Sequence, residues 1–167
     1  MGFSCHCIII TNRKIYKYFI LSDDMGKLKL HDLVTGEVIE APDKPELRIG
    51  RHRDNDVPIP SLDVRDRRDR GELTEIEQCA LTIAMSVSND HARIARYPVI
   101  TMEQGEKIRD WDYSLSDLMS TNGTYVNGRK LEGVRRDAGI GDTINQVRLN
   151  NHDKIRFGPY EMEVLIE

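Results

Sequence analysis

Alternation of apolar and polar residues over short segments is the feature that most restricts the fold of this chain. It is clearest near the C-terminus, where Tyr160, Met162, Val164 and Ile166 alternate with mostly acidic residues. A period of two places successive side chains on opposite faces of a β-strand. The same pattern recurs between turn residues in the segments KLKL, DLVTGEVIEA, ELRIGR, DVPIP, HARIARY, YSLSDL, TYVNGRKL and DKIRF. Many short strands predict an all-β sandwich of two sheets with about eleven strands.

One segment, residues 61–85, departs from this pattern. It begins with a run of mixed charges that we interpret as a solvated loop. Thr74 and Glu77 then have the spacing of a capping box, which marks the start of a helix. Apolar residues follow at helical spacing, and we predict one inserted helix near residues 75–85. The face expected to dock on the sheets consists of Ile76, Cys79, Ala80 and Ile83.

Composition excludes several classes of function. The formal net charge is −4, so the chain lacks the basic character of a nucleic-acid-binding protein, and any anion site must be local. Three cysteines argue against a disulfide framework and favour an intracellular, cytoplasmic location, with a nuclear one left open. No apolar run reaches the ~20 residues that span a bilayer, so we expect no membrane span.

Motifs of the common enzyme classes are missing from the sequence. It contains no Gly-x-Ser-x-Gly elbow and no Gly-Lys-Ser/Thr phosphate loop, so we expect neither catalysis nor a cofactor. Cys5, His6 and Cys7 offer two thiols and an imidazole. However, alternate residues of a strand point to opposite faces, and no second cysteine pair completes a set of four ligands. We therefore expect no metal site.

Four short motifs occur in a characteristic order along the chain. Gly50-Arg51 ends a predicted strand, SVSNDH contains a Ser-x-x-His pattern, DLMSTNGTYVNG follows, and DKIRFG comes last. In this order they resemble the forkhead-associated (FHA) domain, a β-sandwich that binds phosphothreonine peptides. The resemblance covers residues 26–167 and leaves residues 1–25 as an N-terminal extension, for which an added strand is one interpretation.

The resemblance implies a phosphopeptide site in loops at one end of the sandwich. A phosphate monoester carries close to two negative charges and three acceptor oxygens, which a guanidinium and neutral hydroxyl or amide donors can satisfy. The implied phosphopeptide-binding residues are Arg51, Ser88, Asn89, Thr121 and Asn122. The motif residues with implied structural roles are Gly50, His91, Gly123, Asn127 and Gly128.

The chain also departs from the family pattern. Insertions at about 60–85 and 132–148 lengthen two connections, and His152-Asp153 replaces the usual Gly-Asp near the end. Many members have an arginine where this chain has Asn89, which leaves Arg51 as the main cation of the motifs. The candidates for a second cation are Arg53, Arg65, Arg67, Arg68, Arg70 and Arg93.

These features predict a signalling module that recognises phosphothreonine in a partner protein, itself the product of a Ser/Thr protein kinase. Two alternatives remain open at this point. The chain could be an FHA-like scaffold or oligomerisation module that binds its partner without phosphate. It could also bind a phosphothreonine of its own chain or of a second copy, and Thr74 and Thr82 lie in the insertion.

Overall fold

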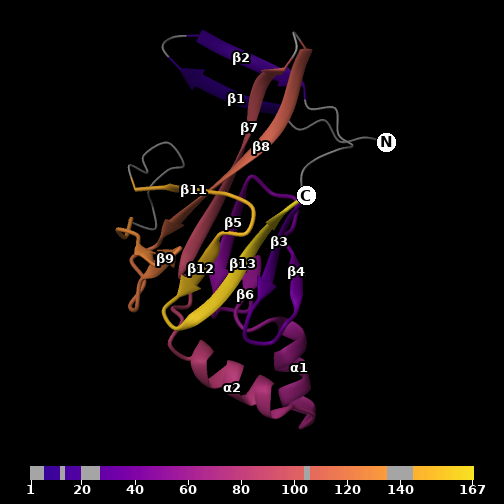
Figure 1. Ribbon diagram of the computed structural model, residues 1–167, viewed down its shortest axis with the longest axis vertical. Coiled ribbons are helices and arrows are strands. Elements are labelled where there is room, and N and C mark those ends of the chain that lie inside the picture. The colour runs from indigo at the N-terminus through magenta and orange to yellow at the C-terminus, as the bar shows by residue number, and fades with distance from the viewer. Residues whose placement is uncertain (1–5, 12–13, 20–26, 104–105, 135–144) are drawn as a thin grey trace.

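The computed structural model describes residues 6–11, 14–19, 27–103, 106–134 and 145–167, and its main body is a sandwich of two sheets (Figure 1). In the first sheet the order is β10 (Arg129–Lys130), β9 (Thr124–Val126), β12 (Lys154–Phe157), β13 (Tyr160–Ile166), β3 (Leu28–Asp32) and β4 (Val38–Glu40). In the second it is β11 (Val147–Leu149), β8 (Glu106–Asp117), β7 (Ala92–Glu103), β5 (Glu46–Gly50) and β6 (Val57–Pro58). The described neighbours in both sheets are antiparallel except β5 and β6, which are parallel.

The alternating residues face each other across the sandwich, as the sequence pattern predicts. On β13 the side chains of Tyr160, Met162 and Val164 are fully buried. They belong to the same apolar core as Ile49 of β5 and Ile94 of β7. Each such burial contributes about 1.5–3 kcal/mol. A shift of the strand by one residue would expose these side chains and lose that free energy. The predicted two-sheet sandwich and its approximate number of strands are confirmed.

The structure describes the N-terminal extension and the second insertion only in part. Strands β1 (His6–Thr11) and β2 (Lys14–Phe19) form a separate antiparallel pair within the N-terminal extension. Cys5 lies outside the described residues, as does most of the second insertion, at 135–144. The described helices include none that is both long and apolar enough to cross a membrane.

The insertion between β6 and β7 forms two helices, α1 (Leu62–Arg70) and α2 (Glu75–Ala84), rather than one. The mixed-charge run interpreted as a loop is α1, so that interpretation was wrong. Ser61 caps its start by accepting a hydrogen bond from the N–H of Val64 at 3.4 Å. Gly71 ends it in a left-handed conformation, with φ of 75°, which glycine adopts without steric cost.

Helix α2 begins at the predicted capping box, and its expected docking face is correct in part. Ala80 and Ile83 pack on the core as predicted, but Ile76 and Cys79 do not. Ile76 is 60% exposed and Cys79 is also exposed, whereas Ala80 and Ala84 are buried in the sandwich core. Small side chains let a helix approach a sheet closely. The same orientation turns Glu77 inward, and a carboxylate can take this position only because donors surround it.

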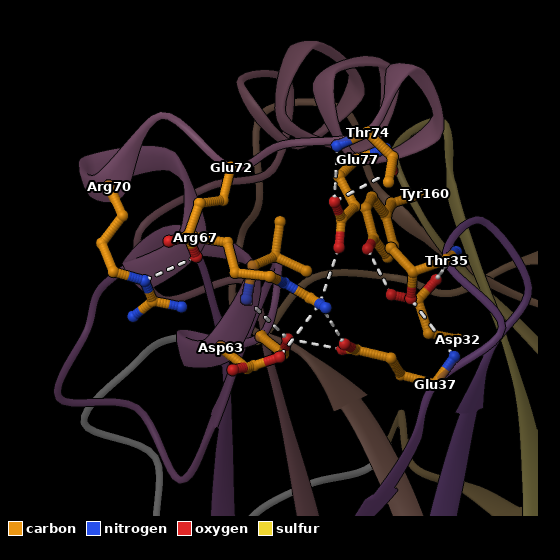
Figure 2. Close-up of polar contacts among 12 residues, drawn as sticks. Asp32, Thr35, Glu37, Asp63, Arg67, Arg70, Glu72, Thr74, Glu77 and Tyr160 are labelled. Atoms are coloured by element: carbon orange, nitrogen blue, oxygen red, sulfur yellow. Dashed lines mark hydrogen bonds and ion pairs between the residues drawn. The ribbon is translucent and has the colours of Figure 1, made fainter.

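Arg67 of α1 supplies one of those donors and attaches both helices to the sandwich (Figure 2). Its Nη2 atom lies 2.6 Å from Glu77 Oε1 of α2, 2.8 Å from Glu37 Oε1 and 3.0 Å from Asp63 Oδ2. Glu37 belongs to the turn between β3 and β4, and its other oxygen accepts a hydrogen bond from the Ser61 hydroxyl at 2.6 Å. The insertion is therefore held by the core contacts of α2 and by this polar network.

Replacing Glu77 with glutamine should change how stability depends on pH. Hydrogen bonds from the backbone and side chain of Thr74, together with the charge of Arg67, hold the pKa of Glu77 below its ordinary value of 4.5. Its contribution is therefore present at neutral pH and is lost as the pH falls through the folded-state pKa. In urea unfolding, Glu77→Gln should be less stable than wild type at neutral pH and lose less stability in acid.

The matched control for this prediction is Glu75→Gln, which removes an exposed carboxylate from the same helical turn. It preserves the capping box and the contact with Arg67. The control should follow the wild-type pH dependence apart from a small helix-dipole effect. Parallel pH curves for wild type and Glu77→Gln would contradict the assignment of Glu77 as an inward, stabilising carboxylate.

Candidate functional site

Three loops meet at the end of the sandwich where α1 and α2 lie (Figure 1). They are the β5–β6 loop, the segment that precedes β7 and the β8–β9 loop. The first two are joined through their backbones, since the N–H of Arg51 donates to the carbonyl of Ser88 at 2.9 Å. The N–H of His52 donates to the carbonyl of Asn89 at 3.1 Å. The sandwich thus brings residues far apart in sequence into one continuous rim.

Gly50 makes the close approach of these two loops possible. A Cβ atom at this position would lie 2.3 Å from the carbonyl oxygen of Asn89 and 2.8 Å from the backbone nitrogen of His91. The side chain of Asn55, which is buried, donates to the same Asn89 carbonyl at 2.6 Å. Sequence reasoning missed Asn55, because nothing in the polar stretch RHRDND distinguishes a buried asparagine from a solvated one.

His91 joins the second loop to the third from beneath. Its Nδ1 accepts a hydrogen bond from the N–H of Ser88 at 3.0 Å, so the proton of the neutral ring is on Nε2, which donates to the carbonyl of Gly123 at 3.1 Å. The imidazole is fully buried and meets the Phe157 ring edge-on, with centroids 5.5 Å apart. Burial lowers the pKa of His91, which keeps the ring neutral and this arrangement of donors intact.

The hydroxyl groups of Ser88 and Thr121 lie side by side on the rim. Ser88 Oγ accepts the N–H of Thr121 at 3.0 Å, and the two hydroxyl oxygens are 3.5 Å apart. The side-chain amide of Asn122 donates to the carbonyl of Ser86 at 2.7 Å, so it braces the loop. Thr121 and Asn122 are exposed, which leaves both residues accessible to a ligand.

A further residue that shapes the β8–β9 loop is Asp117, which was not singled out from the sequence. It is 3% exposed and accepts hydrogen bonds from the Ser120 N–H at 3.1 Å and from the Thr124 hydroxyl at 2.6 Å. The signal was available, because an aspartate three residues before a serine in a polar loop is typical of a side-chain-stabilised turn.

Asn127 and Gly128 form the turn between β9 and β10, with φ values of 49° and 82°. The Asn127 amide donates to Asp153 Oδ1 at 2.8 Å, and its oxygen accepts the N–H of Lys154 at 2.9 Å. These contacts tie the turn to the loop that precedes β12. They belong to the framework of the first sheet and not to the rim where Ser88 and Thr121 meet.

The side chain of Arg51 points toward the helices. Its Nη1 lies 3.6 Å from the sulfur of Met85, just beyond α2, and no hydrogen bond between described residues joins the guanidinium to Ser88 or Thr121. Arg51 and Asn89 instead line a cavity of about 520 Å³ that continues from the rim toward α1 and α2. The predicted ligand-binding residues therefore form two adjoining groups: a hydroxyl pair and a cationic cavity. Met85 was not predicted from the sequence.

The six candidates for a second cation fall into two groups, those that line the cavity and those that lie elsewhere. Arg53, Arg65 and Arg68 line the cavity together with Arg51. Arg67 lies in the network with Glu37 and Glu77, Arg70 pairs with Glu72, and Arg93 is buried 3.6 Å from Glu46. Positive charge from the insertion thus reaches the rim through Arg65 and Arg68, both on α1.

Comparison with known proteins gives one family and one fold. The family model described as "FHA domain" matches residues 47–158. No curated protein sequence gives a significant match. Among solved structures, EmbR from Mycobacterium tuberculosis, in complex with a low affinity phosphopeptide, is 23% identical, with a TM-score of 0.50, over 84% of this chain and 24% of EmbR. The chain thus spans about a quarter of the length of EmbR.

A second solved structure is the FHA domain of yeast Dun1, in complex with a doubly phosphorylated peptide derived from Rad53. It is 19% identical, with a TM-score of 0.50, and the match covers 93% of this chain and 84% of that one. At these identities the two likenesses establish the fold, which agrees with the two-sheet sandwich described above.

Proposed function

The chain belongs to the FHA domain family, and from this premise we propose that it is a phosphopeptide-binding module that recognises phosphothreonine in a partner protein. The observation that carries the proposal is the convergence of Ser88, Thr121, Asn89 and Arg51 on one rim. A pair of hydroxyl donors with a guanidinium in the adjoining cavity suits a dianionic phosphate. The module binds, and we assign it no catalytic step.

The boundaries and roles follow from this assignment. Residues 26–167 form the domain, with the insertions at about 60–85 and 132–148, and residues 1–25 are an extension of it. Arg51, Ser88, Asn89, Thr121 and Asn122 contact the ligand, and the residues beneath them hold the loops. The partner is the product of a Ser/Thr protein kinase. The three cysteines support an intracellular, cytoplasmic location.

The framework supports the proposal because it fixes the rim before any ligand binds. Backbone hydrogen bonds join the first two loops, and His91 joins the second to the third. A pre-formed site avoids the cost of ordering loops on binding. This matters for a short peptide ligand, because a complex of micromolar affinity has only about 8 kcal/mol of binding free energy in total.

Calorimetry with three matched peptides tests this function. The peptide sequence is first selected from a degenerate library with one fixed phosphothreonine, and is then prepared with phosphothreonine, phosphoserine or unmodified threonine. The phosphothreonine peptide should bind, the phosphoserine peptide should bind about tenfold more weakly for lack of one methyl group, and the unmodified peptide should not bind. Equal binding of all three would instead identify a scaffold that acts without phosphate.

A further inference from the structure

The cavity beside Arg51 has a size and a charge that one phosphothreonine does not account for. Its volume of about 520 Å³ falls in the range of pockets that hold entire small ligands, and is more than one phosphate group fills. Four arginines line it, whereas Asp54 is the one acidic residue among the described residues that do so. In a chain with a net charge of −4, this is a pronounced local concentration of positive charge.

Arg65, the central member of this set, is held in place by backbone carbonyls. Its Nη2 donates to the carbonyl of Arg51 at 2.6 Å and to that of Ile59 at 2.8 Å, while its Nε donates to the carbonyl of Pro60 at 3.1 Å. Burial first, and then repulsion from Arg53, Arg68 and Arg51, lowers the pKa of Arg65. The arginines are thus close enough to repel one another, and the fold maintains this arrangement.

Acidic neighbours neutralise this charge only in part. Arg53 lies 3.5 Å from Asp66, and Arg68 lies 2.8 Å from Asp69, but all four side chains are more than half exposed. Exposed pairs of this kind contribute little to stability. A more highly charged anion can therefore displace the two carboxylates from the arginines.

The two inner arginines are less well matched still. Within the described part of the chain no carboxylate forms an ion pair with Arg51 or Arg65, as all the pairs of the insertion involve other arginines. The buried Nε of Arg51 likewise has no hydrogen-bond partner among the described residues. The inner part of the cavity therefore presents guanidinium groups without a matching acid.

We propose that this basic pocket, lined by Arg51, Arg53, Arg65 and Arg68, binds a second phosphate group on the same peptide. The inference rests on the proposed function, because the peptide is what brings the second phosphate to the pocket. Arg51 and Asn89 lie both on the rim and in the pocket, so the two anions bind side by side. Several guanidinium groups match a dianion with three acceptor oxygens better than they match one carboxylate.

The test is a comparison of singly and doubly phosphorylated peptides. A second phosphothreonine is placed at successive positions on either side of the first, and a parallel series has glutamate at those positions. Calorimetry is performed with wild type, with Arg53→Gln/Arg68→Gln, and with Arg70→Gln/Arg148→Gln. The control removes the same charge from two exposed arginines that pair with Glu72 and Asp112 and do not line the pocket.

At one or more positions the second phosphate should tighten binding to wild type about tenfold, the effect of one charge-assisted contact. Glutamate should give a smaller gain. The gain should disappear in Arg53→Gln/Arg68→Gln and persist in the control, and the singly phosphorylated peptide should bind both variants with similar affinity. A gain equal in wild type and the pocket variant, or none at any position, overturns the second site.

The same data separate this inference from the proposed function. If the singly phosphorylated peptide binds wild type and the second phosphate adds nothing, the second site alone is wrong. If the singly phosphorylated peptide does not bind but a doubly phosphorylated one does, with dependence on Arg53 and Arg68, the pocket is supported and the rim assignment fails. If no phosphorylated peptide binds better than the unmodified one, both are wrong.

Discussion

Replacing Arg51 with alanine is expected to weaken binding of the phosphothreonine peptide about a hundredfold. A charge-assisted hydrogen bond contributes about 1.5–3 kcal/mol, and the planar guanidinium can form two with one phosphate. A loss of about 2.8 kcal/mol corresponds to a hundredfold change in affinity, which would bring a micromolar complex close to the limit of detection. Ser88→Ala should have a smaller effect, because it removes a neutral donor.

The fold should survive this substitution. The contacts that tie Arg51 to the loops are made by its backbone, whose N–H donates to the Ser88 carbonyl and whose carbonyl accepts Arg65 Nη2. Thermal unfolding of Arg51→Ala should therefore resemble that of wild type. The matched control is Arg70→Ala, which removes an exposed arginine paired with Glu72 and should leave affinity unchanged. Wild-type affinity in Arg51→Ala would place the phosphate elsewhere on the rim.

The second large effect is expected for His91→Ala, which should lower the free energy of unfolding by about 3 kcal/mol. The substitution empties a fully buried position beside Phe157. It also leaves the N–H of Ser88 without its partner and removes one of the two donors to the Gly123 carbonyl, which keeps the N–H of Gly158. Cavity formation and unsatisfied buried groups each cost a few kcal/mol. Urea unfolding measures the loss, and His52→Ala, at an exposed side chain, should cost far less.

His91 also predicts a pH dependence with a definite sign. Its pKa in the folded state is below the ordinary value of 6.5, so the unfolded chain takes up the proton more readily. The contribution of the neutral His91 ring to the free energy of unfolding is therefore fully present above about pH 6.5. It declines as the pH falls from there toward the folded-state pKa. His91→Ala should show a smaller decline over this interval. An identical decline in both proteins would mean that the ring is not held neutral in the folded state.

The strands could be predicted from the sequence because their pattern is local. A turn residue or an alternating pattern depends only on a few neighbouring residues. The buried face of β13 could therefore be predicted from its own sequence. Helix α1 was hidden for a related reason. Val64 is its one buried residue, so it has no apolar stripe to reveal the helical period. Its signals were at its ends, in Ser61 and Gly71, where capping and not periodicity marks the boundary.

The sequence predicted which loops lie together at the rim, but not how their side chains are oriented. Motif spacing indicated Arg51, Ser88 and Thr121, because each motif lies in a loop and the sandwich brings these loops together. The direction of the Arg51 side chain depends on Met85 and Arg65, which approach it only in the folded chain. The choice of Arg53, Arg65 and Arg68 among six arginines likewise depends on how α1 docks through Arg67.

The loops of the rim are held together mainly by main-chain atoms and by groups that lie below the surface. The N–H groups of Arg51 and His52, the Asn55 amide and the His91 ring make these contacts. The side chains of Arg51, Asn89 and Thr121 contribute little to this frame. Recognition and architecture can therefore change independently during evolution. A library randomised at Arg51, Asn89 and Thr121, with Gly50 and His91 kept, should yield folded domains with new ligand preferences.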